Sequence, residues 1–176
     1  MEPSDGEIVR LVLSGDTESF RFLVARYRQQ YSRYAIVQVG DADGAADAMQ
    51  EAFIRAYDSL DSCRDPDRFG PWFFRILTNQ CHTARSRRRP TQDVAALDLP
   101  ARERTDEALE RSELADRLET ALQRLTAEQR EAFVLKHVDG RSYEEMAELL
   151  GTGVDALKMR VYRAREALRD MMGAQE

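Results

Sequence analysis

The chain has 176 residues, of which 26 are lysine or arginine and 32 are aspartate or glutamate, so its formal net charge is −6. This length suits one medium domain or two small ones, and a hydrophobic content of 43% is enough for a core. No apolar run is long enough to span a membrane, the N-terminus lacks a signal-peptide pattern, and Cys63 and Cys81 are too few for a disulfide framework. We therefore expect a cytoplasmic protein without membrane insertion.

Positive charge is concentrated in one segment of the chain. Residues 65–90 carry 6 basic and 2 acidic residues, whereas the segments on either side are net negative. A protein that binds DNA through its own charge is basic overall. A nucleic-acid function therefore requires either local basic patches or a partner that supplies most of the affinity.

The spacing of apolar residues is helical along the whole chain. No stretch of alternating apolar and polar residues is long enough to indicate a strand, so we expect an all-α fold. Thr126-x-x-Gln129 and Ser142-x-x-Glu145 fit capping boxes, and glycines and prolines mark the other helix ends. The expected helices span residues 5–14, 17–39, 43–61, 68–88, 106–124, 127–138, 143–150 and 154–171.

The segment 89–105 differs from the rest in composition. It contains two prolines, mixed charge and only scattered apolar residues. These features predict a flexible linker between two small helical domains, residues 1–88 and residues 106–176.

Asp47, Gln50 and Glu51 form a polar stripe beside Phe53 on one expected helix. Such a stripe next to an apolar one can dock a partner helix, although an ordinary amphipathic surface helix has the same spacing. That helix has no histidine, and carboxylate metal sites in helical bundles need Glu-x-x-His. We therefore expect neither a metal nor a cofactor.

Aromatic and basic residues are interleaved between Phe69 and Arg89. Single-stranded nucleic acid is bound by rings that stack on bases and by positive charge along the backbone. Trp72 and Phe73 would serve equally well as core residues, so their role is left open, whereas Phe69 and the arginines are expected to contact DNA. The candidates for this contact are Arg68, Phe69, Trp72, Phe73, Asn79, Arg85, Arg87 and Arg88.

Residues 142–169 have the layout of a helix-turn-helix, with the turn at Gly151-Thr152-Gly153. On the second helix Leu157, Val161, Ala164 and Leu168 form one apolar face, which leaves Asp155, Lys158, Met159, Tyr162 and Arg163 pointing outward. From Val154 to Arg169 this helix carries five basic and two acidic residues. A plain helical hairpin has similar spacing, but the basic face favours DNA binding, with early residues at base edges and later arginines on phosphates.

These motifs occur in the order found in sigma factors. The following segments resemble sigma region 2: Asp47-Ala48-Met49-Gln50-Glu51-Ala52-Phe53, and Phe69-x-x-Trp72-Phe73-x-x-Ile76-x-x-Asn79 with the arginine tract after it. The following resemble region 4: Leu125-Thr126-x-Glu128-Gln129-Arg130-x-x-Phe133, Ser142-Tyr143-Glu144-Glu145-Met146-Ala147, and Lys158-x-Arg160-x-x-Arg163-Ala164-Arg165-x-x-Leu168. Together, about residues 15–172 resemble the extracytoplasmic-function (group IV) sigma factors of bacterial RNA polymerase.

The resemblance implies a sigma factor that directs core RNA polymerase to −10/−35 promoters and promotes melting. Asp47, Gln50, Glu51 and Phe53 would bind the clamp helices of the largest subunit, and region 4 would lie on the flap of the second-largest subunit. The segment from Phe69 to Arg89 would bind the melted −10 element, and the linker would pass toward the catalytic centre. Residues implied to bind the −35 element are Ser142, Tyr143, Thr152, Asp155, Ala156, Lys158, Met159, Arg160 and Arg163.

Ala156 and Met159 stand where the family often has small hydroxylated residues, which predicts an unusual −35 preference. A separate anti-sigma factor is expected to regulate the protein. The alternative is a one-component helix-turn-helix regulator with a helical sensor domain, but it leaves the motifs of the first 90 residues unexplained. An enzyme is not expected, because His82 and His137 stand alone without a nucleophile or carboxylate cluster. Whether Cys63 and Cys81 have a redox role is left open.

Overall fold

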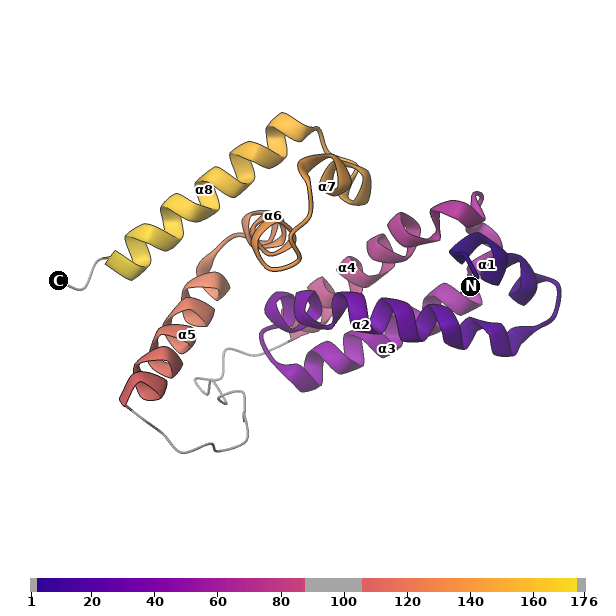
Figure 1. Ribbon diagram of the computed structural model, residues 1–176, viewed down its shortest axis with the longest axis horizontal. Coiled ribbons are helices and arrows are strands. Elements are labelled where there is room, and N and C mark those ends of the chain that lie inside the picture. Colours follow the sequence, from indigo (N-terminus) through magenta and orange to yellow (C-terminus); the bar gives the residue numbers. More distant parts are fainter. Residues whose placement is uncertain (1–2, 88–105, 174–176) are drawn as a thin grey trace.

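The computed structural model describes residues 3–87 and 106–173, and all regular structure in these two ranges is helical. This confirms the expected all-α fold (Figure 1). The predicted linker, residues 89–105, lies outside the described residues. The α-helices are α1 (Asp5–Leu13), α2 (Phe20–Val39), α3 (Ala42–Asp58), α4 (Phe69–Arg87), α5 (Asp106–Arg124), α6 (Ala127–His137), α7 (Tyr143–Leu150) and α8 (Val154–Gly173).

Most helix ends lie within two residues of their predicted positions, because local capping sets them. Ser142 and Glu145 form the predicted capping box of α7, and Gly151 ends this helix with a φ of 61°, which glycine adopts without strain. The larger differences, three residues each, are at the start of α2 and the end of α3. The outer turns expected there are short 3₁₀ segments at Thr17–Ser19 and Leu60–Ser62, and a third 3₁₀ segment, Pro66–Arg68, precedes α4.

In the first half of the chain, α2, α3 and α4 pack against one another, and α1 contacts both α2 and α4. The centre of this bundle is aromatic. The rings of Phe53 and Phe73 stack with centroids 4.7 Å apart, and Phe69 stacks on Phe73 at 5.8 Å. Tyr27 of α2 lies 5.3 Å from both Phe69 and Phe73, so three helices share one aromatic core.

In the second half, α8 packs on α5, α6 and α7. Arg130 of α6 is almost fully buried, and its guanidinium donates to the carbonyl oxygens of Leu122 and Leu125, each at 2.8 Å. These bonds supply donors to carbonyls at the end of α5 and just after it, where a helix leaves C=O groups without intrahelical donors, although the Leu122 carbonyl also accepts from the Leu125 amide at 3.2 Å. They fix α6 against α5 and so support the helix-turn-helix formed by α7 and α8.

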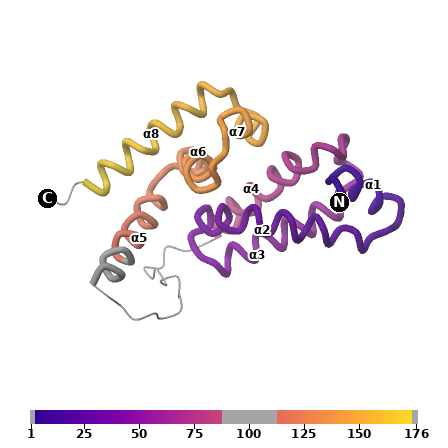
Figure 2. The backbone as a smooth tube through the Cα atoms, in the orientation of Figure 1, coloured from indigo at the N-terminus to yellow at the C-terminus, as the bar shows by residue number. Residues whose placement is uncertain are grey.

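The two halves also pack against each other, which the sequence did not predict. Helix α6 contacts α2 and helix α7 contacts α4, while α8 lies on the far side of α6 and α7 (Figures 1 and 2). Buried residues of α6 and α7 therefore belong to one hydrophobic cluster with those of α2, α3 and α4. No helix in the described ranges is long and apolar enough to span a membrane.

Polar contacts cross this interface as well. Tyr34 Oη of α2 donates to Glu131 Oε1 of α6 at 2.9 Å, and both side chains are buried. Gln123 Nε2 of α5 donates to the carbonyl oxygen of Val37 at 3.0 Å. Burial raises the pKa of the Glu131 carboxyl, while the Tyr34 bond opposes that rise. The ionised carboxylate is thus costly to bury and depends on Tyr34 for compensation.

Candidate nucleic-acid and protein-binding surfaces

The three polar residues of the predicted docking stripe on α3 are accessible to solvent, whereas Phe53 is not. Asp47 and Gln50 are exposed, and Glu51 is half-buried and pairs with Arg55 at 2.9 Å. Phe53 is only 6% exposed and stacks on Phe73, so its expected place on the docking surface is wrong. The reason is helical geometry: Phe53 lies about 200° around α3 from Glu51 and faces the core.

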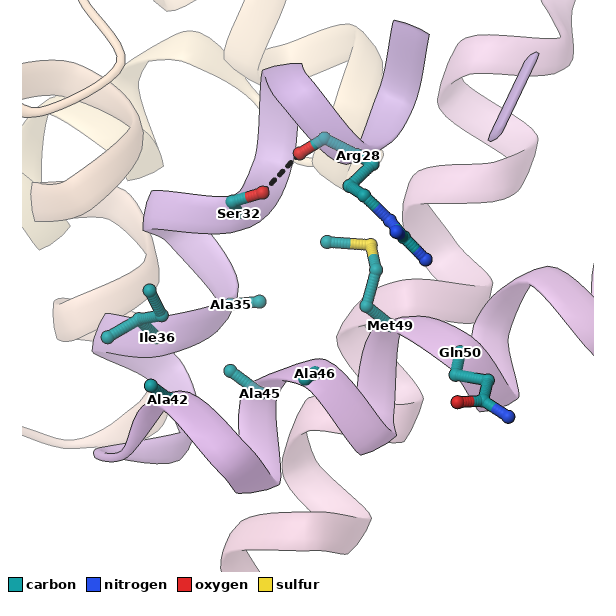
Figure 3. A pocket seen from close by; sticks show the side chains of 9 residues that line it. All are labelled: Arg28, Ser32, Ala35, Ile36, Ala42, Ala45, Ala46, Met49 and Gln50. Carbon is teal, nitrogen blue, oxygen red and sulfur yellow. Dashed lines mark hydrogen bonds between the residues drawn. The ribbon is translucent and has the colours of Figure 1, made fainter. Parts of the chain in front are cut away.

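A pocket of about 310 Å³ opens between α2 and α3, beside this stripe (Figure 3). Met49 extends into the pocket from α3, Arg28 lies opposite on α2, and Gln50 belongs to both the pocket and the docking stripe. Most other lining residues are alanines and an isoleucine. The lining consists of Arg28, Ser32, Ala35, Ile36, Ala42, Ala45, Ala46, Met49 and Gln50. An apolar side chain of a partner could enter here while its polar neighbours meet the stripe.

The aromatic residues of α4 are mainly core. Phe69 and Phe73 are both 0% exposed, so the expectation that Phe69 contacts DNA is wrong, and Phe73 has a core position. Spaced four residues apart, they share the side of α4 that faces α2 and α3. Trp72 is only partly buried, with its ring tilted against Phe69 at 5.6 Å. Trp72 is therefore packed against the core but still partly accessible to solvent.

The polar candidates around α4 divide into two groups. Asn79 and Arg87 are exposed. Arg68 forms an exposed ion pair with Glu148 of α7 at 3.0 Å, and Arg85 donates to the carbonyl oxygen of Gln123 at 2.8 Å. These two arginines contact the second half of the chain, so part of the basic surface expected on α4 is engaged within the molecule. Arg88 lies outside the described residues.

The residues that begin α7 serve the helix itself. Ser142 Oγ accepts from the Glu145 amide at 3.1 Å, and the Ser142 amide donates to Glu145 Oε2 at 2.7 Å. These bonds hold the pKa of Glu145 below its ordinary value. The Lys136 ammonium lies over the Tyr143 ring, 4.7 Å from the ring centroid, which is a cation–π contact. Thr152 is half-buried in the turn that follows.

The outward face of α8 carries most of the predicted −35 contacts. Asp155, Ala156, Lys158, Met159 and Arg163 are all exposed, and Lys158 Nζ lies 3.5 Å from Asp155 Oδ1.

Two positions on α8 differ from the predicted set of −35 contacts. Arg160 pairs with Glu128 of α6 at 3.2 Å and has a side chain only 26% exposed, so it turns toward its own domain. Tyr162, which the predicted set leaves out, is 58% exposed.

Neither cysteine has the environment of a reactive thiol. Both are free and buried. Burial, with Glu131 nearby, raises the pKa of Cys81 to about 12, and burial also raises the pKa of Cys63. Since the thiolate is the reactive form, these environments disfavour redox chemistry at both positions.

Comparison with known proteins agrees with this arrangement. The chain matches the family "Sigma-70 region 2" over residues 23–91 and the family "Sigma-70, region 4" over residues 115–168. The RNA polymerase sigma-H factor of Pseudomonas aeruginosa is 33% identical over 179 residues, covering 95% of this chain and 93% of the relative. The ECF RNA polymerase sigma-E factor of Escherichia coli is 32% identical, covering 94% and 92%.

Solved structures show the same fold. CnrH, in complex with the cytosolic domain of CnrY, has a TM-score of 0.73 at 30% identity, covering 99% of this chain and 100% of that one. The sigma factor RpoE of Bartonella quintana, in complex with the anti-sigma factor NepR, has a TM-score of 0.61 at 27% identity, covering 92% and 99%.

A helical bundle with an exposed polar stripe, followed by a helix-turn-helix, defines a two-region factor of the sigma-70 class. Within that class, the chain belongs to the extracytoplasmic-function sigma factors.

Proposed function

We propose that this chain acts in the cytoplasm as an alternative sigma factor, without catalytic activity of its own, and uses its two regions for different contacts. The observation that carries the proposal is that both regions occur in order in one chain, each with an exposed surface suited to its partner. The net charge of −6 fits this division. Core polymerase supplies the nonspecific DNA affinity, and the sigma factor supplies sequence preference.

The polymerase contact is proposed on α3. Asp47, Gln50 and Glu51 would face the clamp helices of the largest subunit, and the adjoining pocket would receive an apolar side chain from the same partner. A polar rim around an apolar pocket is the usual composition of a protein–protein interface. Region 4 would lie on the flap of the second-largest subunit.

Promoter contacts are proposed on α4 and α8. Trp72, Asn79 and Arg87 are the accessible members of the −10 set, and Trp72 can present its accessible part to an unpaired base. On α8, Lys158 and Met159 lie in the first two turns, where recognition helices reach base edges, and Arg163 lies further along. The solved relatives CnrH and RpoE are bound to the cytosolic domain of CnrY and to an anti-sigma factor, which supports a separate anti-sigma factor for this chain.

Promoter binding would also require the two halves to separate. The −10 and −35 elements lie about 25 base pairs apart, or about 85 Å at about 3.4 Å per base pair. Helix α7 contacts both α4 and α8, and packed helices lie about 8–10 Å apart, so the −10 and −35 surfaces are only about 20 Å apart in the packed arrangement. The packed arrangement of α2 and α4 against α6 and α7 is therefore too short to reach both elements.

The polymerase contact can be tested by reversing charge on α3. The double variant Asp47→Arg, Glu51→Arg is expected to weaken binding to core polymerase at least tenfold, because an acidic stripe is complementary to a basic partner surface, which the two arginines would repel. Its thermal unfolding should be nearly unchanged, since exposed charges contribute little to stability. Binding is measured by titrating labelled protein with core enzyme, and function by transcription in vitro from promoters selected out of a genomic library.

The matched control is Glu113→Arg, Asp116→Arg on α5, which makes the same change in net charge at two exposed positions. This control should bind core polymerase normally. Equal affinity of the α3 variant and the wild type would show that the docking surface lies elsewhere. Failure of the wild type to support transcription from any promoter would reject the proposed function itself.

Substitution of a residue that contacts bases should change sequence preference, whereas substitution of a residue that contacts phosphates should change overall affinity. Changing Lys158 to Ala is expected to alter which −35 sequences are used, with about 1–3 kcal/mol of lost discrimination. Changing Arg163 to Ala should weaken all promoters similarly and reduce the salt dependence of log K by about 0.9 per phosphate lost. Both variants are measured on a randomised −35 library at two salt concentrations. A uniform loss in both would contradict the division of roles.

A further inference from the structure

Two large apolar side chains lie on the outward face of α8, with Asp155 about one turn before them and Glu166 about one turn after them on the same face. Met159 is 48% exposed and Tyr162 is 58% exposed, although both are large and largely apolar side chains. At about 100° per residue, the two lie on the side of α8 opposite the buried residues. Leu157, Val161, Ala164 and Leu168 form that buried side. The packing of α8 therefore fixes Met159 and Tyr162 in solvent.

Cations flank this apolar pair on both sides. Around the helix, Lys158 lies about 40° beyond Tyr162, and Arg163 lies about 40° beyond Met159 on the other side. Both cations are exposed. Single apolar residues on a surface need no explanation, but an apolar pair with a cation on each side matches the DNA major groove, and Lys158 lies close enough to Asp155 to offset its charge. The DNA major groove presents phosphates along its edges and base edges on its floor.

The chemistry of Met159 narrows what it can recognise there. Its thioether is only a weak acceptor, so it cannot pair with the strong donors and acceptors of most base edges. If Met159 covered a donor or acceptor on a base edge, that polar group would lose its hydrogen bond to water, and binding would be weaker. The one apolar group on the floor of the major groove is the C5-methyl of thymine. Ala156, three residues earlier and also exposed, is short enough to leave room beside Met159.

We propose that Met159, supported by Tyr162 beside it, contacts the C5-methyl group of a thymine in the −35 element and thereby selects thymine at that position. This assignment rests on the proposed function, in which α8 enters the major groove. Met159 would then determine specificity through apolar contact with a methyl group. Lys158 would donate a hydrogen bond to a base edge, and Arg163 would bind a phosphate.

The test uses holoenzyme assembled from core polymerase and the full chain. After the preferred −35 element is selected from a randomised library, each thymine in either strand is replaced singly by deoxyuridine, which removes only the methyl group. At one position uracil is expected to weaken binding about fourfold, the value of one buried methyl group at about 0.8 kcal/mol. With Met159→Ala, thymine and uracil at that position should bind equally well.

Two further variants separate this effect from general ones. Leu114→Ala removes an apolar side chain that is 52% exposed on α5, and it should keep the full preference for thymine. Arg163→Ala should weaken the thymine and uracil templates by the same factor.

The proposal is overturned if no thymine is sensitive to loss of its methyl group, or if the preference survives Met159→Ala, and the apolar pair would then be assigned to a protein partner. Promoter-specific transcription by the wild type in the same assay distinguishes this failure from failure of the proposed function.

Discussion

Replacing Phe69 by alanine is expected to lower the free energy of unfolding by about 3–5 kcal/mol, the usual cost of removing a buried phenylalanine. Phe69 is 0% exposed and packs against Tyr27, Trp72 and Phe73. Removing its ring leaves a cavity among rings from α2 and α4, which cannot close without moving whole helices. The change is measured by denaturant unfolding followed by circular dichroism.

Trp72→Ala is the matched comparison. Its side chain is only partly buried, so its truncation should cost less stability than that of Phe69. If Trp72 offers its accessible part to a base, this variant should also transcribe poorly from duplex promoters while keeping activity on a pre-melted template. If the Phe69→Ala protein has normal stability and is defective only in promoter melting, the core assignment is wrong and Phe69 contacts DNA.

Two substitutions at the interface between the halves are expected to shift the molecule in opposite directions. Tyr34→Phe removes the hydroxyl that donates to Glu131 and leaves a buried carboxylate without that partner. Hydrogen bonds to charged groups contribute about 1.5–3 kcal/mol, so the balance should move toward the separated arrangement by about ten- to a hundredfold. Glu131→Gln keeps an acceptor for Tyr34 but removes the buried charge, so it should favour the packed arrangement at neutral pH.

The same pair predicts a dependence on pH. Burial raises the pKa of Glu131 in the packed state, although Tyr34 and Arg160 oppose the rise and Glu128 adds to it. A carboxyl with a raised pKa holds its proton more tightly when packed. Its contribution to packing is therefore fully present at low pH and is lost as the pH rises through the raised pKa. Glu131→Gln should remove this part of the pH dependence.

Small-angle X-ray scattering measures the outcome directly, because separation of the two halves increases the radius of gyration relative to the packed arrangement. Tyr57→Phe is the control, since Tyr57 is exposed on α3 and lies in a different part of the bundle. A shift of both interface variants in the same direction would show that the Tyr34–Glu131 contact does not set the balance.

The sequence alone determined the helices and the identity of the two regions. Helix ends depend on side chains a few residues away, as at Ser142 and Glu145, so they can be predicted from local spacing. The outward face of α8 was equally predictable, because the period of an α-helix assigns Lys158, Met159 and Arg163 to the side opposite the apolar residues. The order of the motifs along the chain identified the family.

Only the tertiary structure decided which aromatic residues of α4 are buried and how the halves meet. Phe69 and Trp72 are neighbours on a helix surface, and their spacing alone does not say which of them faces α2. The contacts Tyr34–Glu131 and Arg68–Glu148 join residues 97 and 80 positions apart. Local periodicity carries no information about such pairs, because they exist only when separate helices pack together and exclude water from the surface between them.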